Sequence, residues 1–191
     1  TDILGKIRSA QEGRSGYPTY EQALQEVREG QKQSHWIWYI WPTLKVLRPD
    51  TVETQFLLPN FQAALDILTD PTLAGNLEEI SQVALGQLGN GVPLNRLMGK
   101  DIDGAKFHES MSLFALCAVV GDHPDACKQL ELCCRCVEAC RKDGLLVPRV
   151  VTEIRRDQTV PLALKDALKD LEKVTTSTLR ALKPESRTTG A

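Results

Sequence analysis

The sequence predicts an all-α fold, a single helical domain of about eight to nine helices with no substantial sheet. Apolar residues recur at helical spacing in several segments, and no run of alternating apolar and polar residues is long enough to build a sheet. The length of 191 residues is that of one domain. With 42% hydrophobic and 25% charged residues, the composition excludes a disordered chain and a small disulfide-stapled scaffold.

The N-terminal part predicts two amphipathic helices and then a short buried one. A glycine-rich turn ends the first helix, and the second begins near Pro18 and ends at Gly30. Residues 31–42 contain all three tryptophans of the chain. Because these rings would point to all sides of a helix, we expect a largely buried helix with Ser34 as N-cap and Pro42 at its end.

The middle of the chain predicts two helices joined by a tight turn. A connector at residues 44–59 leads to an amphipathic helix that begins at Phe61. Asp70 as N-cap and Pro71 in the first turn favour a second helix, which the glycine-rich residues 86–91 end. These glycines follow a helix and lack the lysine and hydroxyl of a phosphate-binding loop, so we interpret them as a turn.

The remainder of the chain predicts further helices of different character. One helical turn at residues 94–98 precedes the most apolar helix, which ends at Val120. Prolines mark the starts of the next two helices, at Pro124 and Pro148. Gly144 ends the first of these two helices, which carries the cysteines. Residues 162–182 carry leucines at helical spacing among alternating charges and predict one amphipathic helix.

All six cysteines lie in one predicted helical region. Cys133, Cys136 and Cys140 are spaced i, i+3, i+7, as on a buried helix face, where free cysteine packs as a small hydrophobe. Three thiolates on one stripe are also able to hold a soft metal, but zinc sites normally draw ligand pairs from separate turns. We therefore expect packed cysteines, no metal and no cofactor.

The charge balance bears on the partners of the protein. Its 23 basic and 25 acidic residues give a net charge of −2, so no overall field draws it to nucleic acid or an anionic membrane. Residues 111–120, the most apolar stretch, are about half as long as a spanning helix. Residues 1–4 show no basic region followed by a hydrophobic one, and the cytoplasm is the expected compartment.

Two blocks of the sequence resemble a known family. Residues 30–42 (GQKQSHWIWYIWP) and residues 99–114 (GKDIDGAKFHESMSLF) are similar to the two hallmark stretches of the domain of unknown function 1810 family, sometimes called calpastatin-like. The resemblance covers roughly residues 3–120 and implies an all-helical fold without an established activity. We expect one domain over residues 1–183, completed by C-terminal helices at 121–183, and a disordered tail at 184–191.

The sequence departs from the family pattern at two places. Trp41-Pro42-Thr43 stands where the family usually has Phe-Pro-Gln, and Glu109 stands at the first of two paired serines. The C-terminal third with its cysteines also fits the pattern poorly. A role for the family's glutamine therefore does not carry over to this chain.

The same two blocks suggest a site for a small anion. Lys32 and Lys106 lie near the predicted starts of two helices, capped by Ser34 and Asp103, where free backbone N–H groups favour anions. We hypothesise a pocket for a phosphorylated small molecule or nucleotide between these helix starts, with both lysines as exposed side chains. Its expected lining is Lys32, Ser34, His35, Trp36, Lys106 and Ser110.

Other interpretations of these residues stay open at the level of sequence. His35 is the only candidate for acid or base catalysis, and whether the protein is an enzyme is left undecided. In the alternative hypothesis the tryptophans form core only, and a helical groove that includes residues 162–182 binds a protein partner. The two hypotheses differ in whether the polar residues converge on one concave surface.

Overall fold

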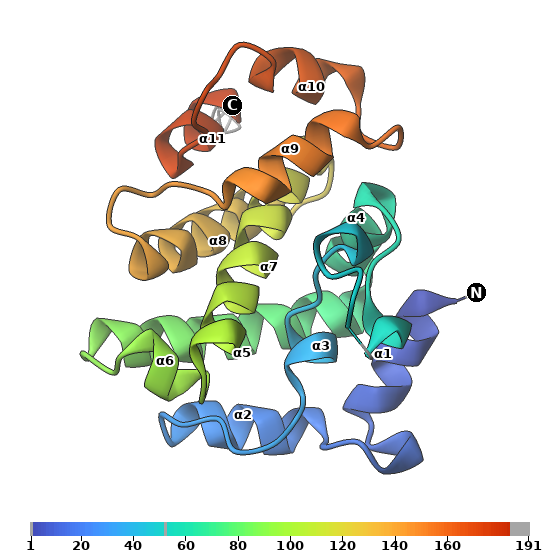
Figure 1. Ribbon diagram of the computed structural model, residues 1–191, viewed down its shortest axis with the longest axis vertical. Helices are drawn as coiled ribbons and strands as arrows, with labels where there is room; N and C mark the ends of the chain where they lie inside the picture. The colour runs from blue at the N-terminus through green and yellow to red at the C-terminus, as the bar shows by residue number, and fades with distance from the viewer. Residues whose placement is uncertain (1, 52, 184–191) are drawn as a thin grey trace, which may run out of the picture.

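The computed structural model describes residues 2–51 and 53–183 and is all-α (Figure 1). Within these ranges the chain forms eleven α-helices, nine of which have seven or more residues. Two isolated β-bridges, Leu44 with Leu58 and Leu145 with Thr175, are the only β pairings in this part of the chain. The predicted fold class is confirmed, and residues 184–191, expected to be disordered, lie outside the described residues.

The helices follow one another with short connections. In chain order they are α1 (Ile3–Gln11), α2 (Tyr20–Arg28), α3 (Ile37–Ile40), α4 (Phe61–Thr69), α5 (Pro71–Gly89), α6 (Leu94–Leu97), α7 (Asp101–Val120), α8 (Ala126–Cys140), α9 (Pro148–Arg156), α10 (Leu162–Leu168) and α11 (Thr176–Leu182).

Helix α7 lies at the centre of the molecule, and Figure 1 shows it passing between the N-terminal and C-terminal helices. It packs along α8 and also contacts α3, α4, α6, α9 and α11. Residues on all its sides are buried, among them Phe107, Met111 and Phe114. A helix that is surrounded in this way has no solvent-facing stripe, which explains why this segment is the most apolar of the chain.

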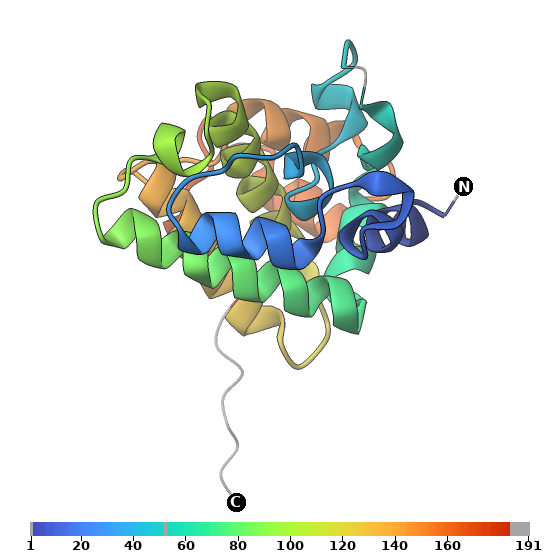
Figure 2. The same cartoon turned by 90° about the horizontal axis from the view of Figure 1, so that it is seen from below.

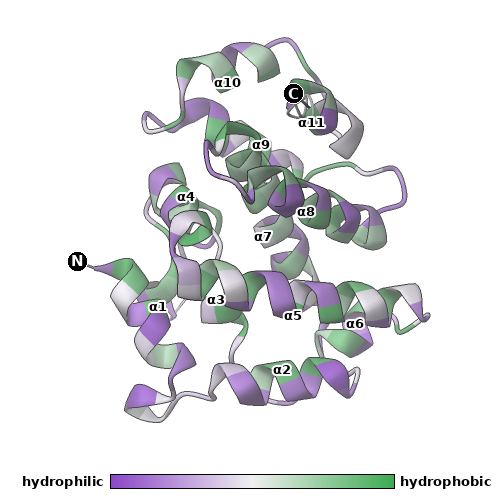
Figure 3. Cartoon of the chain, turned by 180° about the vertical axis from the view of Figure 1, so that it is seen from behind, coloured by the Kyte–Doolittle hydropathy of each residue, from purple (hydrophilic) through white to green (hydrophobic). Residues whose placement is uncertain are grey.

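The outer helices pack their apolar faces on this centre. Helices α2 and α5 lie side by side (Figure 2), and Figure 3 shows hydrophilic and hydrophobic residues alternating along both. Asp70 caps α5 as predicted, since its Oδ1 accepts hydrogen bonds from the backbone N–H groups of Thr72 and Leu73. The glycine at position 86 does not stop α5, which continues to Gly89.

Two predicted N-terminal boundaries were wrong. Helix α2 begins at Tyr20 rather than near Pro18, because the Thr19 side chain accepts a hydrogen bond from the Gln22 N–H and acts as the N-cap. The tryptophan segment forms only the four-residue helix α3, and Ser34 is not its cap.

The C-terminal part differs more from the prediction. Residues 162–182 form two separate helices, α10 and α11, so the prediction of one continuous helix was wrong. Arg180 fixes α11 to α8 through ion pairs with Glu131 and Glu138. Helix α8 begins at Ala126 and ends at Cys140, two residues after the predicted start and four before the predicted stop.

The cysteines of α8 pack largely as predicted. Cys133 and Cys136 are buried, Cys140 is half-buried, and all three are free thiols. Burial raises the pKa of the Cys140 thiol to about 12. Among the described residues, no helix is long and apolar enough to cross a membrane.

Candidate functional site

Lys32 and Lys106 meet on one carboxylate, that of Asp103. Lys32 Nζ lies 3.0 Å from Asp103 Oδ2, and Lys106 Nζ lies 2.9 Å from Asp103 Oδ1. The three side chains, which we call the lysine–aspartate cluster, are between 5% and 8% exposed. The cluster joins the segment that precedes α3 to the first turns of α7.

The backbone around Lys32 fixes its side chain in this position. The Lys32 N–H donates a hydrogen bond to the Leu97 carbonyl oxygen at 2.8 Å. Gly99 has φ of 78°, and a Cβ at this position would lie 2.9 Å from the Lys32 carbonyl oxygen. A glycine at position 99 therefore allows the turn between α6 and α7 to pass close to the Lys32 backbone.

Each lysine of the cluster also faces an indole ring. Lys32 Nζ lies 5.2 Å from the Trp36 ring centroid, and Lys106 Nζ lies 3.7 Å from the Trp38 ring centroid. Trp36 is fully buried, whereas Trp38 is half-buried. The negative ring faces stabilise the ammonium groups, so both lysines are held in place on two sides.

The cluster contains one more positive than negative charge. Burial disfavours the ionised form of Asp103, but the hydrogen bonds from Lys106 and Lys32 outweigh it and hold the pKa of this carboxyl below its usual range. Asp103 is therefore ionised at neutral pH and compensates one of the two ammonium groups. The buried cluster as a whole has a net charge of +1.

The predicted reason for the meeting of the two lysines was wrong. Neither lies at an exposed helix start, since Lys32 is 5% and Lys106 is 8% exposed. The N-cap position of α7 is Lys100 rather than Asp103, and Trp36 rather than Ser34 holds that position in α3. A shared counter-ion, and not two helix dipoles, brings the lysines together.

Beside the cluster is an open cavity of about 420 Å³, the Trp38 cavity. Three of its lining side chains are cationic, namely Lys106, Arg48 and Arg149. The rest of the lining is mostly apolar, with one carboxylate, and consists of Trp38, Leu47, Pro49, Asp50, Thr51 and Ile102. The lining of the cavity thus combines cationic and apolar side chains, and its volume is within the usual range for small-molecule sites.

Arg48 is held at this cavity by Glu109, one of the residues that depart from the family pattern. Arg48 donates to both oxygens of Glu109, at 2.7 Å and 3.3 Å. The Thr43 hydroxyl also donates to Glu109, at 3.4 Å. The two unusual residues therefore contact each other, and Glu109 neutralises the charge of Arg48 while fixing its position.

Two of the other predicted site residues belong to a separate group around Glu26. The Glu26 carboxylate accepts hydrogen bonds from the backbone N–H groups of Gln33 and Ser34, at 2.7 Å and 2.9 Å, and from the Ser34 hydroxyl. It also accepts from Trp36 Nε1 at 2.7 Å. This Glu26 cluster uses the polar groups of Ser34 and Trp36 to hold the loop between α2 and α3.

Ser110 and His35 also lie away from the Trp38 cavity. The buried Ser110 hydroxyl donates to the Pro42 carbonyl oxygen at 2.9 Å, which ties α7 to the chain after α3. His35 is exposed and does not line the cavity. Of the six residues expected to form the site, Lys106 lines the cavity, and Lys32 is linked to Lys106 through Asp103.

Three charged residues, two at the cavity and one in the Glu26 cluster, were not predicted from the sequence. Arg48 lies in a connector without periodicity, and Arg149 is 43 positions away from Lys106 in the chain. Glu26 carried a signal that was overlooked, because it is an acidic residue between the apolar Leu24 and Val27 of one helix.

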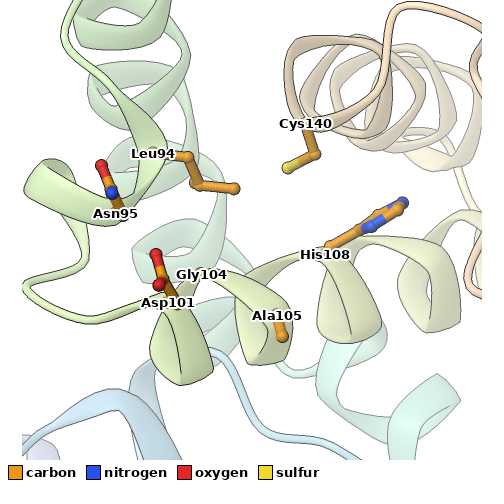
Figure 4. A pocket seen from close by; sticks show the side chains of 7 residues that line it. All are labelled: Leu94, Asn95, Asp101, Gly104, Ala105, His108 and Cys140. Carbon is orange, nitrogen blue, oxygen red and sulfur yellow. The ribbon is translucent and has the colours of Figure 1, made fainter.

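A second cavity, of about 320 Å³, lies between α6, α7 and α8 (Figure 4). His108 and Cys140 lie on one side of it, and Asn95 and Asp101 lie on the other. Burial lowers the pKa of His108 and raises that of Cys140, so both groups are neutral at pH 7. His108 Nε2 is also engaged with the Leu145 carbonyl oxygen at 3.0 Å. This geometry lacks an activated thiolate.

Comparisons with known proteins give the family and the fold. A family model described as "Protein of unknown function (DUF1810)" matches residues 3–141, so the match extends beyond residue 120 and includes α8. The crystal structure of the conserved hypothetical protein Rv1873 from Mycobacterium tuberculosis is similar, with a TM-score of 0.63 and 23% identity. The similarity covers 78% of this chain and 94% of that one, and it shows a shared fold. No curated protein matches the chain.

Proposed function

We propose that this chain, which belongs to the DUF1810 family of proteins of unknown function, binds a small phosphorylated molecule in the Trp38 cavity. One observation carries the proposal: Lys106, Arg48 and Arg149 come from three separate segments and line the same open cavity. The carboxylates beside these cations leave a net positive charge at the cavity, which a bound anion compensates.

The chemistry of the cationic side chains suits phosphate. Arginine presents a planar fork of N–H donors that matches two phosphate oxygens, and lysine adds a compact charge. Arg48 and Lys106 are already oriented by Glu109 and Asp103, so they lose little side-chain freedom when an anion binds. Arg149 is exposed on the first turn of α9 and is the third cation of the lining.

The apolar part of the lining favours an organic ligand over free phosphate. Trp38, Leu47 and Ile102 belong to this part, and Ile102 is 52% exposed. A ligand that covers these side chains removes apolar surface from water, which contributes roughly 25 cal/mol per Å². A phosphate group with an apolar or planar substituent, as in a nucleotide, therefore complements both parts of the lining.

The competing hypothesis of a protein-interaction module has less support in the structure. The exposed large hydrophobic residues among those described are Val46, Ile102 and Leu162. They belong to three different segments, near the 3-10 helix at 45–47, at the start of α7 and at the start of α10. The ligand hypothesis accounts for Ile102, since this residue lines the Trp38 cavity.

A thermal-shift screen with phenyl phosphate and adenosine monophosphate tests the proposed function. A ligand at about 100 times its Kd stabilises the folded state by about 2.7 kcal/mol, so we expect a clear rise in Tm. Arg149→Glu should abolish the rise. Arg156→Glu, at an exposed position on the same helix, should keep it. Equal shifts in both variants, or no shift in the unaltered protein, would contradict the proposal.

A further inference from the structure

We infer that the Trp38 cavity takes a terminal phosphate monoester, a dianion, and that the buried Lys32 sets this preference from outside the cavity. The inference rests on the proposed function and specifies the class of ligand. Its basis is the charge of the side chains around the cavity and the link of Lys32 to Lys106 through Asp103.

The buried charges next to the cavity leave one positive charge uncompensated. Lys32 and Lys106 share the single negative charge of Asp103, which leaves one positive charge. Arg48 is neutralised by Glu109, whose carboxylate lies 2.7 Å from its guanidinium group. Arg149, an exposed residue of the lining, adds a positive charge that is offset by the exposed Asp50 of the same lining.

One acidic residue, Asp50, lines the same cavity. It is exposed, whereas the lysine–aspartate cluster is more than nine-tenths buried. Water and salt screen an exposed charge strongly and a buried charge much less. Asp50 and Arg149 are both exposed and offset each other, so the buried cluster dominates the field in the cavity. A positive field attracts a ligand group with two negative charges more strongly than a group with one.

Lys32 contributes to this field without contacting the ligand. It binds Oδ2 of Asp103 and leaves Oδ1 to Lys106. Without Lys32 the remaining Asp103 and Lys106 form a neutral pair, and the cavity loses one positive charge although each lining residue stays. Lys32 is thus a positioning and charge-setting residue that acts through Asp103.

Two probes that differ by one charge test the inference by titration calorimetry at about pH 8, where phosphate monoesters are dianions. Phenyl phosphate is a monoester, and methyl phenyl phosphate is a diester with the same ring and a single charge. We expect the unaltered protein to bind the monoester about tenfold more tightly than the diester. Lys32→Met should weaken monoester binding about tenfold and lower the preference for the monoester.

A charge-restoring variant separates this role from a purely structural one. Lys32→Met/Asp103→Asn has the same net charge of +1 in the cluster as the unaltered protein, because Lys106 then lacks a counter-ion. We expect it to regain most of the monoester affinity and the preference. Damage to the fold would instead make the double variant worse than the single one. Lys169→Met, which removes an exposed charge elsewhere, serves as the control and should leave both affinities unchanged.

The outcomes distinguish the two proposals. Absence of phenyl phosphate binding in the unaltered protein would overturn both the proposed function and this inference. Equal affinity for the two probes, with loss of binding in Arg149→Glu, would overturn the dianion preference and leave the phosphate site standing. A Lys32→Met variant with unchanged preference, or a double variant without recovery, would overturn the role of Lys32.

Discussion

The Glu26 cluster and the lysine–aspartate cluster are both built around a buried carboxylate, but they differ in the donors that surround it. Glu26 accepts hydrogen bonds from two backbone N–H groups, a hydroxyl and an indole, all of which are neutral. Asp103 instead contacts two ammonium groups. The first group binds a loop to a helix, and the second borders an open cavity.

This difference indicates which of the two groups serves stability and which suits binding. The hydrogen-bonding capacity of Glu26 is used within the fold, and Trp36 beside it is fully buried. The lysine–aspartate cluster has a positive charge left over, and its partner Trp38 is half-buried at the cavity. Buried polar groups that are fully paired rigidify a fold, whereas an excess charge at a cavity attracts a counter-ion.

The largest expected contrast concerns the two indole rings. Trp36→Ala should lower the free energy of unfolding by about 3 to 5 kcal/mol, because it leaves a large cavity in the core. Trp38→Ala should cost clearly less, because its ring is already open to the Trp38 cavity. Urea denaturation of both variants measures the difference, and equal losses would show that Trp38 is as much a core residue as Trp36.

The second contrast is between the buried Glu26 carboxylate and an exposed carboxylate nearby in the chain. Glu26→Gln should destabilise the protein by about 2 to 3 kcal/mol, because an amide cannot accept from all the donors that now point at Glu26. Glu29→Gln, an exposed position just after the same helix, should stay within about 0.5 kcal/mol of the unaltered protein. Similar losses of stability in both variants would show that the buried Glu26 carboxylate contributes no more to stability than an exposed one.

The pH dependence of stability should reveal the ionisation of the Glu26 carboxylate. Burial opposes ionisation of Glu26, but hydrogen bonds from Ser34, Gln33 and Trp36 outweigh it and lower its pKa below the usual value. Its contribution to stability is therefore complete above the unfolded-state pKa of about 4.3 and is lost as the pH falls through the lower folded-state pKa. Stability measured from pH 6 to pH 3 should fall less steeply in Glu26→Gln. An unchanged slope would contradict this assignment.

The smallest expected effect on stability is that of a substitution in the lining of the Trp38 cavity. Arg149→Ala should change the free energy of unfolding by less than about 0.5 kcal/mol, since this side chain is exposed. Phenyl phosphate binding should nevertheless weaken in the same variant, because a charge-assisted contact is lost. A large loss of stability in Arg149→Ala would assign this residue to the fold rather than to a site.

The sequence predicted the helices better than the site. Helical spacing and caps such as Asp70 are local signals, so most helices were found, and errors arose where a side-chain cap replaced a proline start, as at Thr19. The break between α10 and α11 was missed because leucine spacing continues through residues 162–182.

The site depends on contacts between distant parts of the chain. Lys32 and Lys106 were paired correctly in the prediction, but through helix ends rather than through Asp103. Arg48 and Arg149 were absent from it, since no local pattern shows that α9 packs near the connector that carries Arg48. Whether the predicted residues bind a ligand stays a prediction.

A crystal structure of the protein with phenyl phosphate tests the central claim most directly. We predict that the phosphate lies in the Trp38 cavity, within hydrogen-bonding distance of Lys106 and Arg149, with the phenyl ring against the apolar side chains of Trp38 and Ile102. A phosphate bound elsewhere on the protein, or a Trp38 cavity without the probe at saturating concentration, would contradict the account.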